Sequence, residues 1–203
     1  MTESVLGVLA SGRGTNLQSI INAIATGQIK AKIGVVITDK IEAKALDRAR
    51  EANIQAVCID RKKCSSKEDF EHKLVAALRE YGVNLVVLAG FMRLLSPYFV
   101  QAFKDRILNI HPSLLPAFGG AHAHRDVLAY GVKVSGCTIH FVDEGMDSGP
   151  IILQESVPVL PGDTEDTLAA RVLEKEHSLY PRAIALYIDG KLVVNGRQVI
   201  IQS

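Results

Sequence analysis

Short apolar runs alternate with helical segments over the first half of the chain, and this alternation limits the possible folds more than any other feature. The runs suit buried strands, and between them apolar residues recur three and four positions apart, as helices require. The expected strands are 5–10, 33–37, 55–59 and 84–89, and the expected helices are 15–27, 43–52 and 65–81. Such alternation predicts parallel βαβ units with right-handed crossovers, and the dense apolar strands predict a sheet covered by helices on both faces.

The second half mixes extended and helical segments. We expect a short helix from about residue 96, strands at about 107–111, 133–142 and 150–157, and a long helix over 164–188. Pro181 lacks an N–H group, so we expect a kink or a break before it. Asn195-Gly196 between two apolar runs predicts a C-terminal hairpin. The sequence therefore indicates a mostly parallel sheet with an antiparallel C-terminal portion.

Composition excludes several classes of protein. The chain has 203 residues, 48% of them apolar, and a net charge of +1, which favours a globular protein and disfavours non-specific nucleic-acid binding. Three widely spaced cysteines predict neither disulfides nor a zinc site. Without a leader or a long apolar stretch, we expect a cytoplasmic protein. We expect a single domain over 1–203, with halves at about 1–105 and 106–203.

Asn109 and His111 form the strongest candidate for chemistry. They alternate with Ile110, so on an extended strand both side chains project from the same face. Pro112 should end that strand, and open α/β sheets bind ligands just outside the carboxyl ends of strands. An amide beside an imidazole can stabilise an oxyanion and move a proton. The alternative is that Asn109 caps a turn and His111 is a hydrogen-bonded core residue.

Other motifs remain open to two interpretations. The glycine-rich turn 11–16 suits an anion, although it matches neither a Walker A loop nor a full dinucleotide fingerprint, and it also fits a plain strand-to-helix turn. The glycine-flanked loop 144–149 could bring Asp147 to His111 and favour the imidazolium, or Asp147 could be a turn residue. His140 fits a packed or hydrogen-bonded residue better than a catalytic one. Arg93 could clamp a carboxylate or be a surface cation.

A further pair of histidines, His122 and His124, invites a metal site. No acidic or cysteine cluster accompanies the pair, so we favour a structured loop around His122, His124 and Arg125 near the site.

Several motifs occur in one order and carry a resemblance. They are Ser11-Gly12-Arg13-Gly14-Thr15-Asn16-Leu17, Leu88-Ala89-Gly90-Phe91-Met92-Arg93, Asn109-Ile110-His111-Pro112-Ser113-Leu114-Leu115-Pro116, His140-Phe141-Val142-Asp143, Asp147-Ser148-Gly149-Pro150-Ile151-Ile152 and Glu176-His177. From Val5 to about Gly190, the chain resembles the phosphoribosylglycinamide formyltransferase family of folate-dependent enzymes. The resemblance implies a Rossmann-like formyltransferase fold and transfer of a formyl group from 10-formyltetrahydrofolate to the amine of 5-phosphoribosylglycinamide.

The resemblance also implies roles for residues. The catalytic residues would be Asn109, His111 and Asp147, supported by His140 and Ser113. The ribonucleotide would contact Arg13, Gly14, Thr15, Asn16 and Glu176. The folate would contact Phe91, Met92, Arg93, Leu94, Leu95, Asn109, Val142, Asp143, Glu144 and Asp147. The partners would be these small molecules, with no metal, nucleic acid or membrane, in a monomer or homodimer.

Two positions depart from the family pattern, and three other functions share parts of it. Gly119 stands where many relatives have proline, and Leu173 where some have a polar residue, so the ribonucleotide contacts could differ. A formyltetrahydrofolate deformylase or a methionyl-tRNA formyltransferase would be expected to carry an additional domain, and the near-neutral charge disfavours tRNA binding. A non-catalytic folate- or nucleotide-binding module would need only the apolar pocket and the glycine turn.

Overall fold

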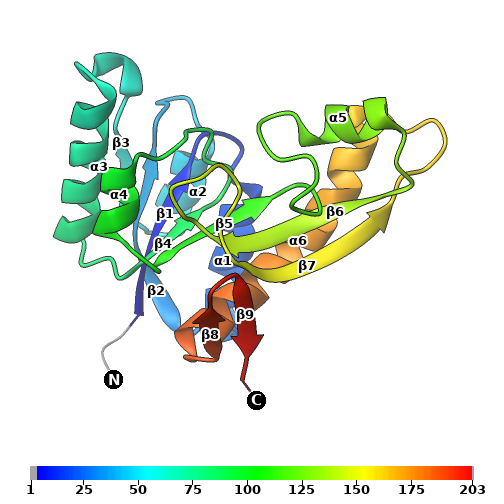
Figure 1. The fold of residues 1–203 in the computed structure, drawn as a ribbon. Helices are drawn as coiled ribbons and strands as arrows, with labels where there is room; N and C mark the ends of the chain where they lie inside the picture. Colours follow the sequence, from blue (N-terminus) through cyan, green and yellow to red (C-terminus); the bar gives the residue numbers. More distant parts are fainter. Residues whose placement is uncertain (1–3, 203) are drawn as a thin grey trace. The chain divides into compact units, whose positions relative to one another are not determined.

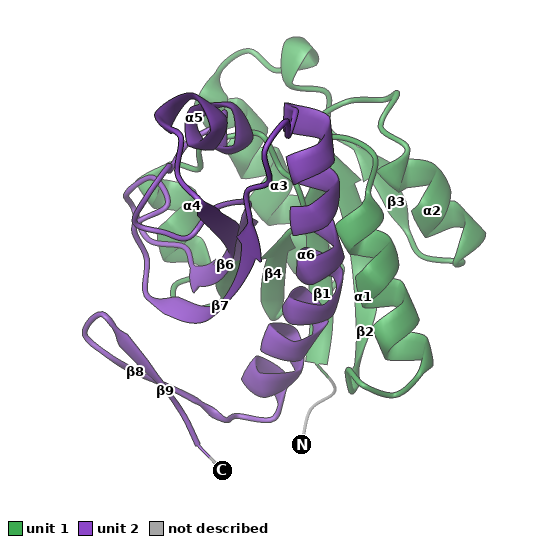
Figure 2. Ribbon diagram, turned by 90° about the vertical axis from the view of Figure 1, so that its right-hand side faces the viewer, with its two compact units in different colours: residues 1–108 green, residues 109–203 purple. Residues whose placement is uncertain are grey.

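The computed structural model describes residues 4–202. It divides into two compact units, Met1–Leu108 and Asn109–Ser203, which Figure 2 shows in different colours. Each unit is described separately below. In the described part of the chain, no helix is long and apolar enough to cross a membrane.

Unit 1 has the alternating strands and helices that the sequence predicts (Figure 1). Its elements are β1 (Ser4–Ala10), α1 (Thr15–Ala25), β2 (Ala31–Thr38), α2 (Ala45–Glu51), β3 (Ala56–Cys58), the 3-10 helix η1 (Arg61–Lys63), α3 (Lys67–Glu80), β4 (Leu85–Leu88), α4 (Pro97–Ala102) and the start of β5 (Ile107–His111). The strands follow the order β3-β2-β1-β4, and the β1–β2, β1–β4 and β2–β3 pairs are all parallel.

The strand order fixes where the helices of unit 1 lie. The chain moves outward from β1 to β3 and then returns to β4 on the other side of β1, so right-handed crossovers place α3 on the face opposite α1 and α2. Packing on the α3 face is close, because a Cβ at Gly7 would come within 2.4 Å of Leu78. Ser66 caps α3 and accepts a hydrogen bond from the Asp69 N–H group.

Unit 2 forms the antiparallel portion. Its elements after β5 are α5 (Ala123–Tyr130), β6 (Val134–Phe141), β7 (Ile151–Pro158), α6 (Glu165–Ile188), β8 (Leu192–Asn195) and β9 (Gln198–Ile201). The end of β5 is followed in the sheet by β6, β7, β9 and β8. The β6–β7 and β8–β9 pairs are antiparallel, and α6 packs on β6 and β7. A C-terminal antiparallel portion ending in a hairpin is therefore confirmed.

Two local expectations for unit 2 need correction, the break before Pro181 and the loop around His124. One helix, α6, runs across Pro181 without the break we considered, because the neighbouring Tyr180, Ala183 and Ile184 are fully buried and their packing outweighs the lost backbone hydrogen bond. The segment that contains His124 and Arg125 is the first turn of α5 rather than a loop. This helix is only 8 residues long, which is too short to be stable without the packing of the folded chain.

Candidate active site

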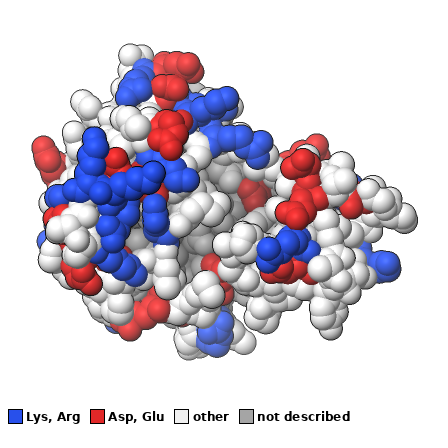
Figure 3. All heavy atoms as spheres, turned by 90° about the horizontal axis from the view of Figure 1, so that it is seen from above, with Lys and Arg blue, Asp and Glu red and all other residues white. Residues whose placement is uncertain are grey.

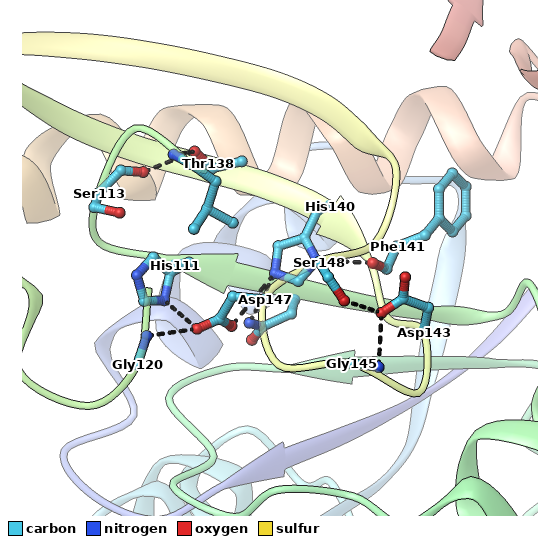
Figure 4. A network of polar contacts seen from close by, with 12 residues as sticks. His111, Ser113, Gly120, Thr138, His140, Phe141, Asp143, Gly145, Asp147 and Ser148 are labelled. Atoms are coloured by element: carbon cyan, nitrogen blue, oxygen red, sulfur yellow. Dashed lines mark hydrogen bonds and ion pairs between the residues drawn. The ribbon is translucent and has the colours of Figure 1, made fainter. Parts of the chain in front are cut away.

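In unit 2, the turn between β6 and β7 carries Asp147 to His111 near the end of β5 (Figure 4). His111 Nδ1 lies 3.4 Å from Asp147 Oδ2, and the two side chains are only 6% and 15% exposed. A partly desolvated carboxylate beside an imidazole is a strong local electrostatic contact because little water screens it. The structure thus brings together two of the three residues expected to be catalytic.

Both ring nitrogens of His111 face hydrogen-bond acceptors. Nδ1 faces the Asp147 carboxylate, and Nε2 donates to the Phe118 carbonyl oxygen over 2.9 Å. Nε2 therefore carries a hydrogen, and Nδ1 lies where a hydrogen would point toward the carboxylate. A substrate oxygen that received the Nε2 hydrogen would have to compete with the Phe118 carbonyl.

Asp147 is held in place by the backbone and by its own loop. Its Oδ2 accepts from the Gly120 N–H group over 2.8 Å, and its backbone is left-handed, with φ of 50°. Aspartate and asparagine tolerate that conformation better than most residues. Asp143 Oδ1 accepts from the Gly145 N–H group and from the Ser148 hydroxyl, which closes the loop (Figure 4). The carboxylate is therefore preorganised.

The hydrogen bonds of His140 determine the orientation of the third residue, Asn109. His140 Nδ1 donates to the Phe141 carbonyl over 2.7 Å, so Nδ1 carries the hydrogen. Burial lowers the pKa of His140, so the ring is neutral and Nε2 is an acceptor. The amide nitrogen of Asn109, 3.1 Å away, must therefore donate to Nε2. Because His140 is neutral, its 3.8 Å approach to Asp147 is not an ion pair.

This buried histidine predicts a pH-dependent stability. Below its ordinary pKa of 6.5, the unfolded chain takes up a proton at His140 that the folded chain, with its lowered pKa, takes up less readily. The free energy of unfolding should therefore fall as the pH drops below about 6.5. In His140→Gln the fall should be smaller, as urea unfolding above and below this pH would measure. An equal fall in both proteins would contradict the assignment of a neutral His140.

Ser113 fixes the chain that follows β5. Its hydroxyl donates to the Ala117 carbonyl over 2.6 Å, and its own carbonyl accepts from the Thr138 hydroxyl over 2.7 Å. Thr138 Oγ in turn accepts from the Leu115 N–H group over 3.0 Å. These bonds tie the segment leading to Phe118 to β6, so Ser113 supports the loop from a distance and none of its hydrogen bonds goes to the catalytic cluster.

Unit 1 contains the glycine-rich turn, and its geometry suits an anion. Gly14 has φ of +70°, and a Cβ there would lie 2.8 Å from Ala45 Cα, so only glycine fits. Helix α1 begins at Thr15 without acidic residues in its first turn. Its first N–H groups have no partner within the helix, and the helix dipole favours negative charge there. Arg13 is exposed beside this turn.

The segment Phe91–Leu95 borders a cavity within unit 1. Phe91 and Leu95 are buried, whereas Met92 and Leu94 are 69% and 59% exposed. The cavity has a volume of about 230 Å³ and is lined by Arg61, Lys67, Phe70, Glu71, Arg93, Leu94 and Leu95. Arg61 and Lys67 were missed by sequence reasoning because they stand in a charged stretch that resembles any solvated surface. Figure 3 shows Lys and Arg side chains gathered over one part of the surface.

The other predicted residues lie in unit 2. Glu176 is a buried residue of α6, and Val142, Asp143 and Glu144 follow β6.

Burial, and after it the nearby charge of Glu176, raises the pKa of the Cys137 thiol to about 12, so this thiol is inert. His124 has a pKa lowered by burial. Among residues 4–202, no group of three or more His, Cys, Asp or Glu side chains could hold a metal ion.

Comparison with known proteins identifies the family. The formyl transferase family model matches residues 6–184. The chain is 45% identical to phosphoribosylglycinamide formyltransferase of Escherichia coli K12 over 185 residues, covering 91% of this chain and 87% of that protein. It is 47% identical to the trifunctional purine biosynthetic protein adenosine-3 of Gallus gallus, covering 93% of this chain but only 19% of that protein. Glycinamide ribonucleotide transformylase 1 of Symbiobacterium toebii superposes with a TM-score of 0.97 at 50% identity, covering 99% of this chain and 95% of that one. The chain therefore belongs to the formyl transferase family.

Proposed function

We propose that this chain transfers a formyl group from 10-formyltetrahydrofolate to the amine of 5-phosphoribosylglycinamide, a step of de novo purine biosynthesis in the cytoplasm. The observation that carries the proposal is the placement of Asn109, His111 and Asp147 around His140 and the end of β5. A module that only binds folate or nucleotide has no need of a buried carboxylate–imidazole pair. The names of the relatives give the formyl group and its acceptor, and the folate donor is the one that the family resemblance implies.

The chemistry begins with attack of the neutral amine on the formyl carbon. A C–N bond forms, and the carbonyl oxygen becomes an oxyanion. The second N–H group of Asn109 and the imidazolium of His111 stabilise that charge, each by roughly 3–4 kcal/mol. As the oxyanion re-forms the carbonyl, the bond between the formyl carbon and the folate nitrogen breaks. Asp147 sustains the imidazolium and relays the amine proton, through a water molecule, to that departing nitrogen. No metal takes part.

Binding is assigned to the remaining residues. The ribonucleotide phosphate lies at the glycine turn, against Arg13, Gly14, Thr15 and Asn16, and Glu176 contacts the ribonucleotide. The folate lies along Phe91–Leu95 and contacts Val142, Asp143 and Glu144. The cavity with three cations, Arg61, Lys67 and Arg93, suits the carboxylates of the folate glutamate.

A spectroscopic assay tests the reaction. Purified protein is mixed with 10-formyltetrahydrofolate, with and without 5-phosphoribosylglycinamide, and the folate absorbance is followed. We expect turnover only when the ribonucleotide is present. Turnover without it would indicate a deformylase, and binding of both compounds without turnover would indicate a binding module.

Replacement of Thr15 by valine tests the phosphate position. Valine has almost the same shape but no hydroxyl, so it removes one hydrogen bond to a charged group, worth roughly 1.5–3 kcal/mol. We expect the KM for the ribonucleotide to rise by about tenfold or more, with the KM for the folate unchanged. Thr26→Val, at the other end of α1, is the control. An effect confined to the folate KM would show that the phosphate binds elsewhere.

A further inference from the structure

The segment from Gly90 to Ser96 has no regular structure, yet buried polar groups hold it at three places. At its start, the Ser11 N–H group donates to the Gly90 carbonyl, and the Ser11 hydroxyl accepts from the Met92 N–H group, both over 3.0 Å. Asp39 holds the middle and Glu71 holds the end. All three side chains are at least 95% buried and come from different parts of unit 1.

Asp39 orients the guanidinium of Arg93. The Arg93 Nε–H group donates to Asp39 Oδ2 over 2.7 Å, and the Asp39 side chain is fully buried. Its other oxygen is buried and has no hydrogen-bond partner among residues 4–202, so the bond to Arg93 is what compensates this carboxylate. Because Asp39 takes Nε, the two terminal nitrogens of Arg93 remain for the cavity that Arg93 lines.

Glu71 holds the end of the segment through a single residue. Its Oε1 accepts from the Ser96 N–H group over 2.9 Å, and its Oε2 forms a short hydrogen bond with the Ser96 hydroxyl. Ser96 Oγ already caps α4 by accepting from the Phe99 N–H group. Lys67 Nζ, 3.9 Å from Oε1, forms an ion pair with Glu71, and the Lys67 side chain is 44% exposed. Glu71, on α3, therefore fixes the position of Ser96, the residue that follows Leu95.

Helix capping alone does not account for these carboxylates. Burying an ionised carboxylate costs several kcal/mol unless specific partners compensate it. The 6-residue α4 already has its serine cap and a proline at its start, so Glu71 is not needed to begin it. What the two carboxylates share is that both bind the segment that borders the cavity.

We propose that Asp39 and Glu71 are positioning residues for the folate, which hold Arg93 and Ser96 so that segment 91–95 keeps the shape that receives it. This inference rests on the proposed function, in which that segment binds 10-formyltetrahydrofolate. Neither carboxylate is proposed to touch the substrate.

The sign of the effect in Asp39→Asn and Glu71→Gln separates positioning from simple electrostatics. Both variants remove a negative charge near a cavity proposed to take a carboxylate. If charge alone mattered, the KM for 10-formyltetrahydrofolate would fall. If the carboxylates position the segment, this KM should rise by about tenfold, while kcat and the ribonucleotide KM stay within about twofold. Glu80→Gln, an exposed charge loss on the same helix, should change none of them.

Two further measurements and a fallback pair of variants complete the test. Assays run well below each Tm exclude a merely structural role, which would lower Tm without changing the folate KM. Glu71→Gln combined with Ser96→Ala should raise the KM little beyond Glu71→Gln alone, because both changes break the same contact. If Glu71→Gln does not fold, Asp39→Asn and Ser96→Ala decide the matter.

The outcome also separates this inference from the proposed function. A lower or unchanged folate KM in the folded variants, or an equal rise in the ribonucleotide KM, would overturn the positioning role. Arg93→Ala is the reference. If it raises the folate KM and the carboxylate variants do not, only the inference fails. If Arg93→Ala leaves the folate KM unchanged, the folate has been placed wrongly.

Discussion

Asp147→Asn should lower kcat by about 10²–10⁴-fold while the protein folds normally. Among residues 4–202, the Asp147 carboxylate is the charged group that lies against His111 Nδ1, at 3.4 Å. The amide of asparagine can neither stabilise an imidazolium nor relay a proton. Folding should be preserved because asparagine adopts the left-handed backbone of residue 147 at least as readily as aspartate. Its side-chain oxygen can still accept from the Gly120 N–H group.

The measurement is steady-state kinetics with both substrates, beside thermal unfolding of the variant. Asp126→Asn is the matched control, because Asp126 also lies in unit 2 and forms an exposed ion pair with its neighbour Arg125. We expect this control to keep the parent kcat. A kcat for Asp147→Asn within a few-fold of the parent would remove the carboxylate from the mechanism, whatever the stability of the variant.

The residues that could be predicted from the sequence are those whose placement is local. Asn109 and His111 share a face because a strand alternates its side chains, and Pro112 marks where that strand ends. Gly14 and the start of α1 follow from turn and helix chemistry within a few residues. The alternation of strands and helices likewise fixed the parallel pairing of unit 1.

What could not be predicted depends on contacts between distant residues. The position of Asp147 depends on a loop that Asp143 closes and on the Gly120 N–H group 27 residues away. The sequence favoured a packed or hydrogen-bonded His140, but the lowered pKa that keeps its ring neutral depends on how deeply the folded chain buries it. Asp39 and Glu71 were overlooked for the same reason, since a carboxylate that binds a residue 54 or 25 positions away looks like any other surface charge in the sequence.

The neutral His140 makes a second large effect predictable, in Asn109→Asp. Aspartate has the size of asparagine but only accepts hydrogen bonds when ionised, so the variant loses the N–H group offered to the oxyanion and the one given to His140 Nε2. Loss of one oxyanion donor should lower kcat by about 10²–10³-fold. The introduced carboxylate should also raise the pKa of His140 from its lowered value, because Nε2 then needs a hydrogen of its own.

These two consequences can be measured separately, which makes the variant more informative than a truncation to alanine. Kinetics report the lost donor, and an NMR titration of the histidine ring nitrogens reports the pKa of His140. Asn195→Asp, in the exposed C-terminal hairpin, adds the same charge and should change neither. A lowered kcat with an unchanged pKa of His140 would mean that His140 Nε2 is already protonated in the parent protein. In that case the Asn109 side-chain oxygen, not its nitrogen, faces His140, and the amide hydrogens that we assign to the oxyanion are oriented differently.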